Sequence, residues 1–566
     1  MSPSELPAEP SPTPELSVVI ATYNRAAQLR TCLDALARQD GVAGAFEVVV
    51  VMDGSTDGTR QLLADYRGPY PLRAIYQENA GQCRALNRGV AEAAGRFCLL
   101  LDDDIIPGPG LVAAHLLAQR EGAGVLATGR LTMDPPPHAD WYVLQFCGSW
   151  LRHYQRLDTG QRQVAISDCY SGNLSFPRDA FVAVGGFAVD LARGYDIELA
   201  VRLARSDLPV VYLPSASAIN NDRKTSGQLL RDEEDAGASA VEIYRRHAAT
   251  LSEIGLHTFA DDGRVEVACR RLLLAVHFPL APLRAVGVVL GWLGRARRWA
   301  TFVRHYVFWR GVRRALGDEA AWRSLTQGVT ILLYHAIGEP GERGSRFVVA
   351  AREFAWQMAW LARKGYRVLD LDEYVRSRRE HRLAPGGSVV ITFDDGYVDN
   401  ASVAAPLLAE RRFPATIFLV TGRMGGCNDW DRNGVLAGRE IMSWQAARAI
   451  EERGIRLAPH GRSHTVLEGI PSDDLDGEIR GAWETLSREA TRPVPVFAFP
   501  FGRYDHGATA AVRRAGLYGA CTVHRGRNWL STPLDALRRV DVRGDRGRLA
   551  FRLAVWRGDE RVRIRR

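Results

Sequence analysis

The chain has 566 residues, of which 46% are hydrophobic and 24% charged, with a formal net charge of +8 and an isoelectric point near 9.1. This composition is typical of folded domains and excludes a mainly disordered chain; at about 150 residues per domain, it predicts three to four domains or two large ones. The basic charge suits anionic phospholipid, nucleotide diphosphates or nucleic acid, and does not choose among them.

Several kinds of segment are not found in the sequence. No stretch offers the roughly 20 uninterrupted apolar residues of a membrane-spanning helix. Residues 1–15 are rich in Pro, Ser and Glu, lack the features of a secretory signal, and are expected to form a disordered tail. The eight cysteines are scattered without a Cys-x-x-Cys pair, which predicts free thiols in a reducing compartment. No recognised nucleic-acid-binding module is found, so no nucleic-acid partner is expected.

From residue 16 onward, strand and helix patterns alternate. Apolar blocks predict strands at 17–21, 46–52, 72–77 and 97–101, and the stretches between them predict helices at 29–38, 59–66 and 84–94. This alternation predicts a doubly wound parallel sheet with helices on both faces. Ligands bind beyond the carboxyl ends of such strands. The polar clusters at those ends begin at Thr22, Asp53 and Asp102.

The third polar cluster is a run of three aspartates. Because side chains alternate along a strand, Asp102 and Asp104 are expected on one side and Asp103 on the other. Such a carboxylate pair suits Mg²⁺ or Mn²⁺, which can neutralise the charge that builds up on a diphosphate leaving group. The alternative is an acidic loop that only starts the helix after Pro109.

Four motifs in this first half resemble the family-2 glycosyltransferases: SVVIATYNR, VVVMDGSTDGT, ENAGQCRALNRGV and LLLDDDIIP, in this order and spacing. The resemblance implies a GT-A fold, a nucleotide-diphosphate sugar donor, expected to be a UDP-sugar, and a glycan or lipid-linked acceptor. Asp53 would contact the uracil-type base, and Asp102 and Asp104 would serve the ribose and the metal. The residues that the resemblance assigns to the donor site are Thr22, Tyr23, Asn24, Asp53, Arg84 and Asp102.

The segment RGYDIE resembles the acceptor side of the same family, which normally reads Glu-Asp at this point. The resemblance assigns the general base that takes the proton of the acceptor hydroxyl to Asp196, with Tyr195 in place of the glutamate. The alternative is a helix start capped by Asp196, with an i,i+4 pair of Glu198 and Arg202. A histidine common downstream in the family is absent, and INND stands in its place.

Residues 266–325 are predicted to link the two halves of the chain. Prolines and charged residues interrupt their apolar part, which argues against a spanning helix. Their later part mixes aromatic residues with clustered arginines, which favours a helix in the headgroup region of a membrane. The alternative is a pair of helices packed on the first domain with the arginines outward.

A second alternating pattern occupies residues 326–566. Strands are predicted at 329–335, 388–393, 415–420, 455–458 and 496–499, and the helices between them include 351–364 and 473–490. Repeated β-α units over this length predict a closed barrel whose chemistry lies at the carboxyl ends of its strands.

Two motifs at those strand ends indicate a metal site. Asp394 and Asp395 follow one strand, and His460 and His464 lie four residues apart after another, a spacing that lets both imidazoles face one cation if the turn is helical. One aspartate and two histidines make a three-ligand site with room for water, as catalytic metal hydrolases require. The alternative is that the aspartates are caps and the histidines ordinary loop residues.

Together with FAFPFG, these motifs resemble the polysaccharide deacetylase family, also called carbohydrate esterase family 4 or the NodB-homology domain. The resemblance implies a distorted (β/α) barrel and a Zn²⁺ or other divalent transition metal held by Asp395, His460 and His464. It makes Asp394 the base that activates water, and it assigns oxyanion stabilisation to the backbone N–H of Phe501.

The acid that protonates the leaving amine is expected at an unusual place. The late Leu-x-x-x-x-His motif that supplies it in many family members is not found. Tyr334-His335 matches the branch that deacetylates poly-N-acetylglucosamine, which makes His335 the predicted general acid and Arg539 a residue that orients the site. Ala498, in place of an arginine common in other members, also fits this branch.

These inferences predict two enzymes in one α/β chain: an inverting glycosyltransferase at 16–265 and a metal-dependent sugar N-deacetylase at 326–566. If the second domain deacetylates an N-acetylhexosamine that the first domain transfers, joining the two domains in one chain would raise the effective concentration of this product at the second site. One alternative is a working deacetylase with a transferase-like domain that binds nucleotide or glycan without catalysis; another is a scaffold in polysaccharide assembly. Because nucleotide sugars are cytosolic, a cytoplasmic location is expected, with the arginine-rich segment at the inner face of the cell membrane.

Overall fold

The computed structural model describes residues 13–122, 124–191, 193–338, 345–431 and 434–557. The chain divides into two compact units, one made of residues up to 255 with 264–317, the other of 256–263 with the residues from 318 onward. Of the segment 266–325 that was predicted as a linker, residues up to 317 therefore belong to the first unit and the remainder to the second. The predicted tail lies outside the described residues as far as residue 12.

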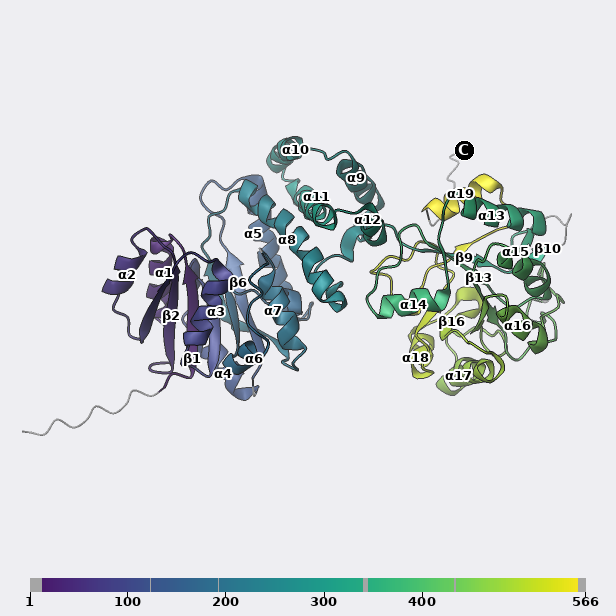
Figure 1. The fold of residues 1–566 in the computed structure, drawn as a ribbon, viewed down its shortest axis with the longest axis horizontal. Coiled ribbons are helices and arrows are strands. Elements are labelled where there is room, and N and C mark those ends of the chain that lie inside the picture. Colours follow the sequence, from purple (N-terminus) through teal and green to yellow (C-terminus); the bar gives the residue numbers. More distant parts are fainter. Residues whose placement is uncertain (1–12, 123, 192, 339–344, 432–433, 558–566) are drawn as a thin grey trace, which may run out of the picture. The chain divides into compact units, whose positions relative to one another are not determined.

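The first unit is built on an eight-stranded sheet with the order β3-β2-β1-β4-β7-β6-β8-β5 (Figure 1). Its first four strands run parallel and lie where the sequence predicts strands: β1 (Leu16–Thr22), β2 (Phe46–Asp53), β3 (Leu72–Gln77) and β4 (Phe97–Asp102). The sheet is mixed beyond β4, because β7 pairs antiparallel with β4 and β5 antiparallel with β8. These later strands are β5 (Ile105–Pro107), β6 (Leu126–Met133), β7 (Asn173–Pro177) and β8 (Val210–Asn220).

Helices cover both faces of this sheet, as the alternating pattern predicts. Val18 and Ile20 of β1 pack with Leu29 and Leu33 of α1, whereas Val19 packs on the opposite face, in a cluster with residues of α3. This two-sided burial explains why the central strands carry apolar residues on both faces. The helices that belong to the sheet region are α1 (Ala26–Leu36), α2 (Thr59–Asp65), α3 (Gln82–Glu92), α4 (Leu111–Glu121), α6 (Arg178–Ala183) and α7 (Tyr195–Ala204).

The rest of the first unit is a helical layer in which α11 packs closely against α8 (Figure 1). Gly237 of α8 and Gly311 of α11 permit this approach, because a Cβ on either would collide with a backbone carbonyl oxygen of the other helix. The helices of this layer are α5 (Trp141–Asp158), α8 (Ser226–Arg246), α9 (Arg264–Ala275), α10 (Leu280–Trp292) and α11 (Ala296–Leu316).

This packing contradicts the interpretation of the aromatic residues of α11 as membrane-facing. Phe302, Tyr306 and Trp309 are 9%, 0% and 1% exposed, because they pack inside the unit. Arginines of the same helix point outward and pair with acidic residues of α8; Arg314, for example, lies 2.9 Å from Asp235. The alternative, helices packed on the first domain with arginines outward, therefore describes α11. Among the described residues, no helix is both long and apolar enough to cross a membrane.

The second unit is a closed barrel of parallel strands. Ladder pairs give the order β15-β14-β13-β9-β18 and pair β16 with β17, while the bridges Leu457–Pro493 and Cys521–Leu537 connect β15 towards β16 and β17 towards β18. Because these two junctions are single bridges, the barrel is distorted. Its strands are β9 (Thr330–Tyr334), β13 (Val389–Phe393), β14 (Ala415–Leu419), β15 (Ile455–Pro459), β16 (Val496–Ala498), β17 (Gly519–Cys521) and β18 (Val540–Asp541).

Three short strands and a ring of helices complete this unit. β12 (Val368–Leu369) pairs with the start of β13, and β10 (Ala336–Gly338) pairs with β11 (Val348–Ala350). The helices are α12 (Glu319–Thr326), α13 (Ala351–Arg363), α14 (Leu371–Arg379), α15 (Ala405–Ala409), α16 (Trp444–Glu451), α17 (Ser472–Glu489), α18 (His506–Arg514) and α19 (Arg548–Arg557).

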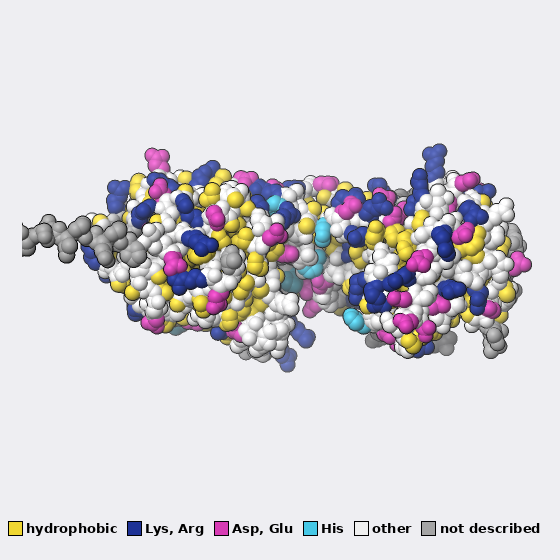
Figure 2. All heavy atoms as spheres, turned by 90° about the horizontal axis from the view of Figure 1, so that it is seen from below, with side chains coloured by type: hydrophobic (Ala, Val, Ile, Leu, Met, Phe, Trp, Pro, Cys, Tyr) yellow, Lys and Arg dark blue, Asp and Glu magenta, His cyan; other side chains and the backbone are white. Residues whose placement is uncertain are grey.

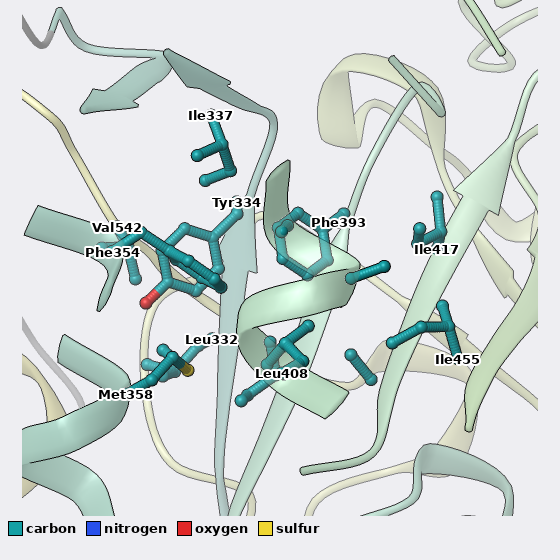
Figure 3. Packing of buried hydrophobic residues seen from close by; sticks show 14 of the residues in the cluster. Leu332, Tyr334, Ile337, Phe354, Met358, Phe393, Leu408, Ile417, Ile455 and Val542 are labelled. Atoms are coloured by element: carbon teal, nitrogen blue, oxygen red, sulfur yellow. The ribbon is translucent and has the colours of Figure 1, made fainter. Parts of the chain in front are cut away.

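An aromatic cluster between the barrel strands and α13 fixes the end of β9 (Figure 3). The ring of Tyr334 stacks on Phe393 with centroids 5.3 Å apart and meets Phe354 edge-on at 5.2 Å. Its hydroxyl group donates a hydrogen bond of 2.8 Å to Gln357. The next residue, His335, is thus held at the carboxyl end of the barrel by a well-packed neighbour.

Candidate active sites

The predicted donor-site residues of the first unit gather at the carboxyl edge of its parallel strands, and several of them shape loops. Asp53 is buried, and its carboxylate accepts hydrogen bonds of 2.8 Å from the backbone N–H groups of Ala80 and Gly81. The guanidinium group of Arg84 donates to the carbonyl oxygen of Ala80 in the same loop. Asp53 therefore fixes the loop before α3, next to which Arg84 lies exposed.

The segment after β1 has a similar structural role. Asn24 has a φ of 54°, and its side-chain oxygen accepts from the backbone N–H groups of Thr56 and Asp57 at 2.7 and 3.2 Å. Thr22 is buried and donates to Asp103 at 2.8 Å. Tyr23 is 50% exposed, so its ring remains accessible at this edge.

The three aspartates do not alternate as the strand pattern predicts. β4 ends at Asp102, so the next two residues turn, and Asp103 and Asp104 share the guanidinium group of Arg25 at 3.2 and 2.8 Å. Asp102 instead accepts a hydrogen bond of 3.1 Å from Gln82. The expected pairing of Asp102 with Asp104 on one side, away from Asp103, is therefore wrong.

The electrostatics of this cluster fit a divalent cation. Burial, together with the nearby carboxylates of Asp104, Asp103 and Asp196, raises the pKa of Asp102 to about 8. One carboxylate oxygen of Asp104 is buried and has no hydrogen-bond partner among the described residues. A cation would offset the repulsion among these carboxylates, and Asp102 and Asp104 remain the residues predicted to hold Mg²⁺ or Mn²⁺.

Asp196 lies in the first turn of α7, facing the same edge. Gly194, with a φ of 68°, occupies the N-cap position, so Asp196 does not cap the helix. Its carboxylate accepts from the backbone N–H groups of Ile197 at 2.9 Å and Ser171 at 3.4 Å, and burial raises its pKa. The other part of the helix-start alternative is present, because Glu198 and Arg202 form an i,i+4 ion pair of 2.6 Å.

Two features of this site were missed at the sequence level. Arg25 ends the motif SVVIATYNR, but its contact with two aspartates depends on the turn after β4. The INND segment adjoins the aspartates, since the backbone N–H of Asn221 donates to the carbonyl oxygen of Asp104 at 2.9 Å. Asp222 adds a further negative charge near Asp104 and Arg25.

The second site is a cavity of about 340 Å³ at the carboxyl ends of the barrel strands. The predicted residues that line it are His335, Asp394, Asp395, His460, His464 and Phe501. Arg539 lies behind Asp394. Chain segments from five parts of the barrel thus converge on one space.

Asp395, His460 and His464 form the predicted three-ligand cluster. One candidate ligand atom from each lies within 4.8 Å of the others, and all three residues are buried. The Nε2 atoms of His464 and His460 lie 3.1 and 3.5 Å from the same carboxylate oxygen of Asp395. The Nδ1 atom of His460 is hydrogen-bonded to the carbonyl oxygen of Ala498 at 2.8 Å, which leaves Nε2 as the ligand atom.

The charge state of this cluster suits metal binding. Burial lowers the pKa of His460 to about 4, so its imidazole is neutral at pH 7. Burial would raise the pKa of Asp395, but the neighbouring histidines, foremost His464, hold it below its ordinary value. A neutral imidazole and an ionised carboxylate are ligands typical of Zn²⁺ and related ions.

The two histidines meet without the helical turn that their spacing suggested. They lie in an irregular loop after β15, in which Gly461 and His464 have φ values of 82° and 62°. Glu478 holds this loop by accepting from the backbone N–H groups of Arg462 and Ser463, both at 2.9 Å.

Asp394 is held by Arg539. Two guanidinium nitrogens donate to its two carboxylate oxygens at 2.6 and 2.8 Å, and both residues are buried. Burial would raise the pKa of Asp394, but Arg539 and His460 hold it below its ordinary value. Asp394 is therefore an ionised carboxylate beside the three-ligand cluster, and Arg539 holds it in one orientation.

The remaining wall of the cavity combines predicted and unpredicted residues. His335 contacts the ring of Phe347, and Phe501 has a φ of 56° and approaches the ring of His464. Trp430 stacks on His464 with ring centroids 4.4 Å apart. Tyr397 donates to Asp395 at 2.8 Å and ends the motif ITFDDGY, whereas nothing in the sequence around Trp430 pointed to the site.

Comparison with known proteins matches a different family to each half of the chain. Residues 17–185 match the family model described as glycosyl transferase family 2, and residues 382–520 match the polysaccharide deacetylase model. The chain thus carries one domain of each family.

Individual relatives match one half of the chain each. A Bacillus subtilis protein, YxkH, whose name places it among polysaccharide deacetylases, is 25% identical over 41% of this chain and 78% of its own length. The validoxylamine A glucosyltransferase of Streptomyces hygroscopicus subsp. jinggangensis is 31% identical over 36% of this chain, which spans only 55% of that protein.

A solved structure, the mannosyltransferase PcManGT of Pyrobaculum calidifontis in complex with GDP-Man and Mn²⁺, is 21% identical with a TM-score of 0.39, and the match covers 56% of this chain and 91% of that one.

Proposed function

We propose that the second domain hydrolyses the N-acetyl group of an N-acetylhexosamine in a glycan. The observation that carries this proposal is the buried Asp395, His460 and His464 cluster beside an Asp394 whose two carboxylate oxygens are held by Arg539. A general base next to a three-ligand metal site is the arrangement that metal-dependent amide hydrolysis requires.

Each residue of the cavity has a defined task in this proposal. A divalent ion bound by the cluster would act as a Lewis acid that polarises the amide carbonyl and lowers the pKa of water. Asp394 accepts the proton of the attacking water, and Arg539 keeps this carboxylate ionised and oriented. His335, which lines the same cavity, protonates the amine as it leaves, and the N–H of Phe501 stabilises the oxyanion, an interaction worth about 3–4 kcal/mol.

We further propose that the first domain transfers a sugar from a UDP-sugar to a glycan or lipid-linked acceptor at the cytoplasmic face of the membrane. Asp196 takes the proton of the acceptor hydroxyl, a role that its burial and raised pKa support. Asp102 and Asp104 would hold Mg²⁺ or Mn²⁺, which would neutralise the leaving diphosphate.

One observation favours a second candidate, a transferase-like domain that binds nucleotide or glycan without catalysis. Arg25 pairs with both Asp103 and Asp104 and offsets part of their negative charge, which reduces the need for a cation. Release of UDP from UDP-N-acetylglucosamine, measured with and without Mn²⁺, distinguishes an active transferase from a domain that only binds. An active transferase releases UDP only when Mn²⁺ is present, and Asp196→Asn abolishes this release. The exposed Asp40→Asn is the matched control.

Acetate release from chitin oligosaccharides by the Zn²⁺-loaded protein tests the deacetylase. We expect activity in the unmodified chain and in Asp473→Asn, an exposed carboxylate of α17, and a loss of at least about 100-fold in Asp394→Asn. Equal activity in the unmodified chain and Asp394→Asn would refute the assignment of the base.

A further inference from the structure

The first unit contains a basic cavity of about 720 Å³ between α5 and α11. Four arginines line it, Arg152 and Arg156 from α5 and Arg297 and Arg304 from α11. Its other described lining residues are neutral, and they include none of the residues assigned to the donor site. Four positive charges thus surround one space without an acidic residue in its wall.

These arginines are poorly neutralised by the protein. In the described part of the chain, no ion pair joins Arg152, Arg156 or Arg297 to a carboxylate. The Nε atom of Arg304 is buried without a hydrogen-bond partner among the described residues, and Glu233 approaches it only to 3.9 Å. Burial, and then the charges of Arg297 and Arg156, lower the pKa of Arg152, as expected where like charges crowd together.

The start of α11 adds to the positive potential of the cavity. The helix has 21 residues, begins at Ala296 and has no acidic residue in its first turn. Its N-cap residue is Arg295, and Arg297 and Arg298 follow. Cations are unfavourable at a helix N-terminus, whereas anions are stabilised there by the free backbone N–H groups and the helix dipole. An anion in the cavity would relieve this local charge conflict.

Exposed apolar side chains lie on α10, which packs against both helices that form the cavity. Helix α10 leads directly into α11, and Gly287 of α10 sits against the ring of Trp141 at the start of α5. On the same helix and the turn after it, Val289, Trp292 and Leu293 are 52%, 84% and 61% exposed. In Figure 1, α9 and α10 lie beyond α11 as seen from the sheet.

On the face shown in Figure 2, Lys and Arg side chains are interspersed with Asp and Glu side chains, as on an ordinary protein surface. A soluble anion needs the arginines but gains nothing from an exposed tryptophan and its aliphatic neighbours. An anionic lipid can use both the arginines and the apolar side chains, because its phosphate group pairs with cations and its acyl chains contact apolar surface.

We propose that the cavity between α5 and α11 binds the phosphate group of an anionic lipid, while the exposed side chains of α10 enter the apolar region of the same lipid layer. This site differs from the membrane-facing helix predicted from sequence, in which the aromatic residues of α11 itself were the contact. It does not depend on sugar transfer or deacetylation, because lipid binding can be measured without either substrate.

Vesicle co-sedimentation of the full chain tests the proposal. The probes are vesicles of phosphatidylcholine alone and of phosphatidylcholine with 30% phosphatidylglycerol. We expect binding only to the anionic vesicles, weakened about 30-fold in Arg156→Gln/Arg297→Gln. Arg38→Gln/Arg453→Gln removes the same charge at other exposed positions and should bind like the unmodified chain. Trp292→Ser should also weaken binding, and thermal unfolding confirms that each variant is folded.

Isothermal titration with inorganic pyrophosphate distinguishes a lipid from a soluble anion. Pyrophosphate binding that Arg156→Gln/Arg297→Gln abolishes, without any vesicle binding, would show an anion site and overturn the lipid assignment. Vesicle binding that is equal in the two double variants would overturn the cavity as the site. Selective loss in Arg156→Gln/Arg297→Gln and in Trp292→Ser supports the proposal in full.

Discussion

The pair of Arg539 and Asp394 offers a demanding test of the deacetylase site. Arg539→Met removes the guanidinium group but keeps much of the side-chain volume, so Asp394 is left as a buried carboxylate without its two hydrogen bonds of 2.6 and 2.8 Å. Removal of one partner from a buried ion pair costs about 3–5 kcal/mol. For a domain of roughly 250 residues, each kcal/mol lowers Tm by about 2–4 °C, which predicts a loss of about 6–20 °C in the barrel transition.

A double-mutant cycle shows whether this loss comes from the pair itself. Differential scanning calorimetry of Arg539→Met, Asp394→Leu and the combined variant should give a combined cost well below the sum of the single costs, with a coupling of about 2 kcal/mol or more. Arg539→Lys keeps a charge but not the two-pronged contact, so it should remain more stable than Arg539→Met and yet lose acetate release. A Tm loss under about 2 °C in Arg539→Met, or strictly additive costs, would refute the reasoning.

Three further predictions concern other parts of the chain. Dialysis against dipicolinate should abolish acetate release, and added Zn²⁺ should restore it. His464→Ala should lower the amount of bound metal measured by mass spectrometry. Full activity in the metal-free protein would contradict the proposed metal site. Gly311→Ala should lower the Tm of the first unit through an overpacking cost of about 1–3 kcal/mol. Gly227→Ala, in α8 of the same unit, should not lower it, because the nearest atom to a Cβ there lies at 3.8 Å. Equal shifts in Tm would argue against close packing of α8 and α11. Burial opposes the ionised form of Glu198, but Arg202 and His247 lower the pKa of this carboxyl group below its ordinary value. The ionised Glu198 therefore stabilises the fold above the pKa of the unfolded chain, and this stabilisation is lost as the pH falls through the pKa of the folded state. The Tm difference between the unmodified chain and Glu198→Gln should therefore be present at pH 7 and shrink below about pH 4; a difference independent of pH would contradict it.

The sequence predicted the parallel strands well because their signal is local. β2 is buried along its whole length and apolar from Val48 to Met52, and such runs have few alternatives to a central strand. The mixed half of the first sheet was not foreseen, since strand direction depends on partners far away in the chain. The aromatic residues of α11 show the same limit: their pattern suits a lipid surface or a protein core, and the presence of α8 decides between them.

The sequence motifs predicted which residues form the sites better than they predicted the local geometry of those residues. Asp395, His460 and His464 could be predicted as a cluster, but the positive φ of His464 and the loop held by Glu478 replace the helical turn assumed from spacing. The alternation of Asp102 and Asp104 failed because β4 ends at Asp102. Trp430 was missed because its contact with His464 is made by tertiary structure alone.

The junction between β15 and β16 links metal binding to the mechanics of the barrel. Strand pairing is sparse there, with Val494 donating to Leu457 at 2.7 Å, and the bond from His460 to Ala498 crosses the same junction. An ion that immobilises His460 would therefore also hold the neighbouring strands β15 and β16 together. Amide hydrogen exchange around residues 494–498 should then be slower in the metal-loaded protein than in the metal-free protein.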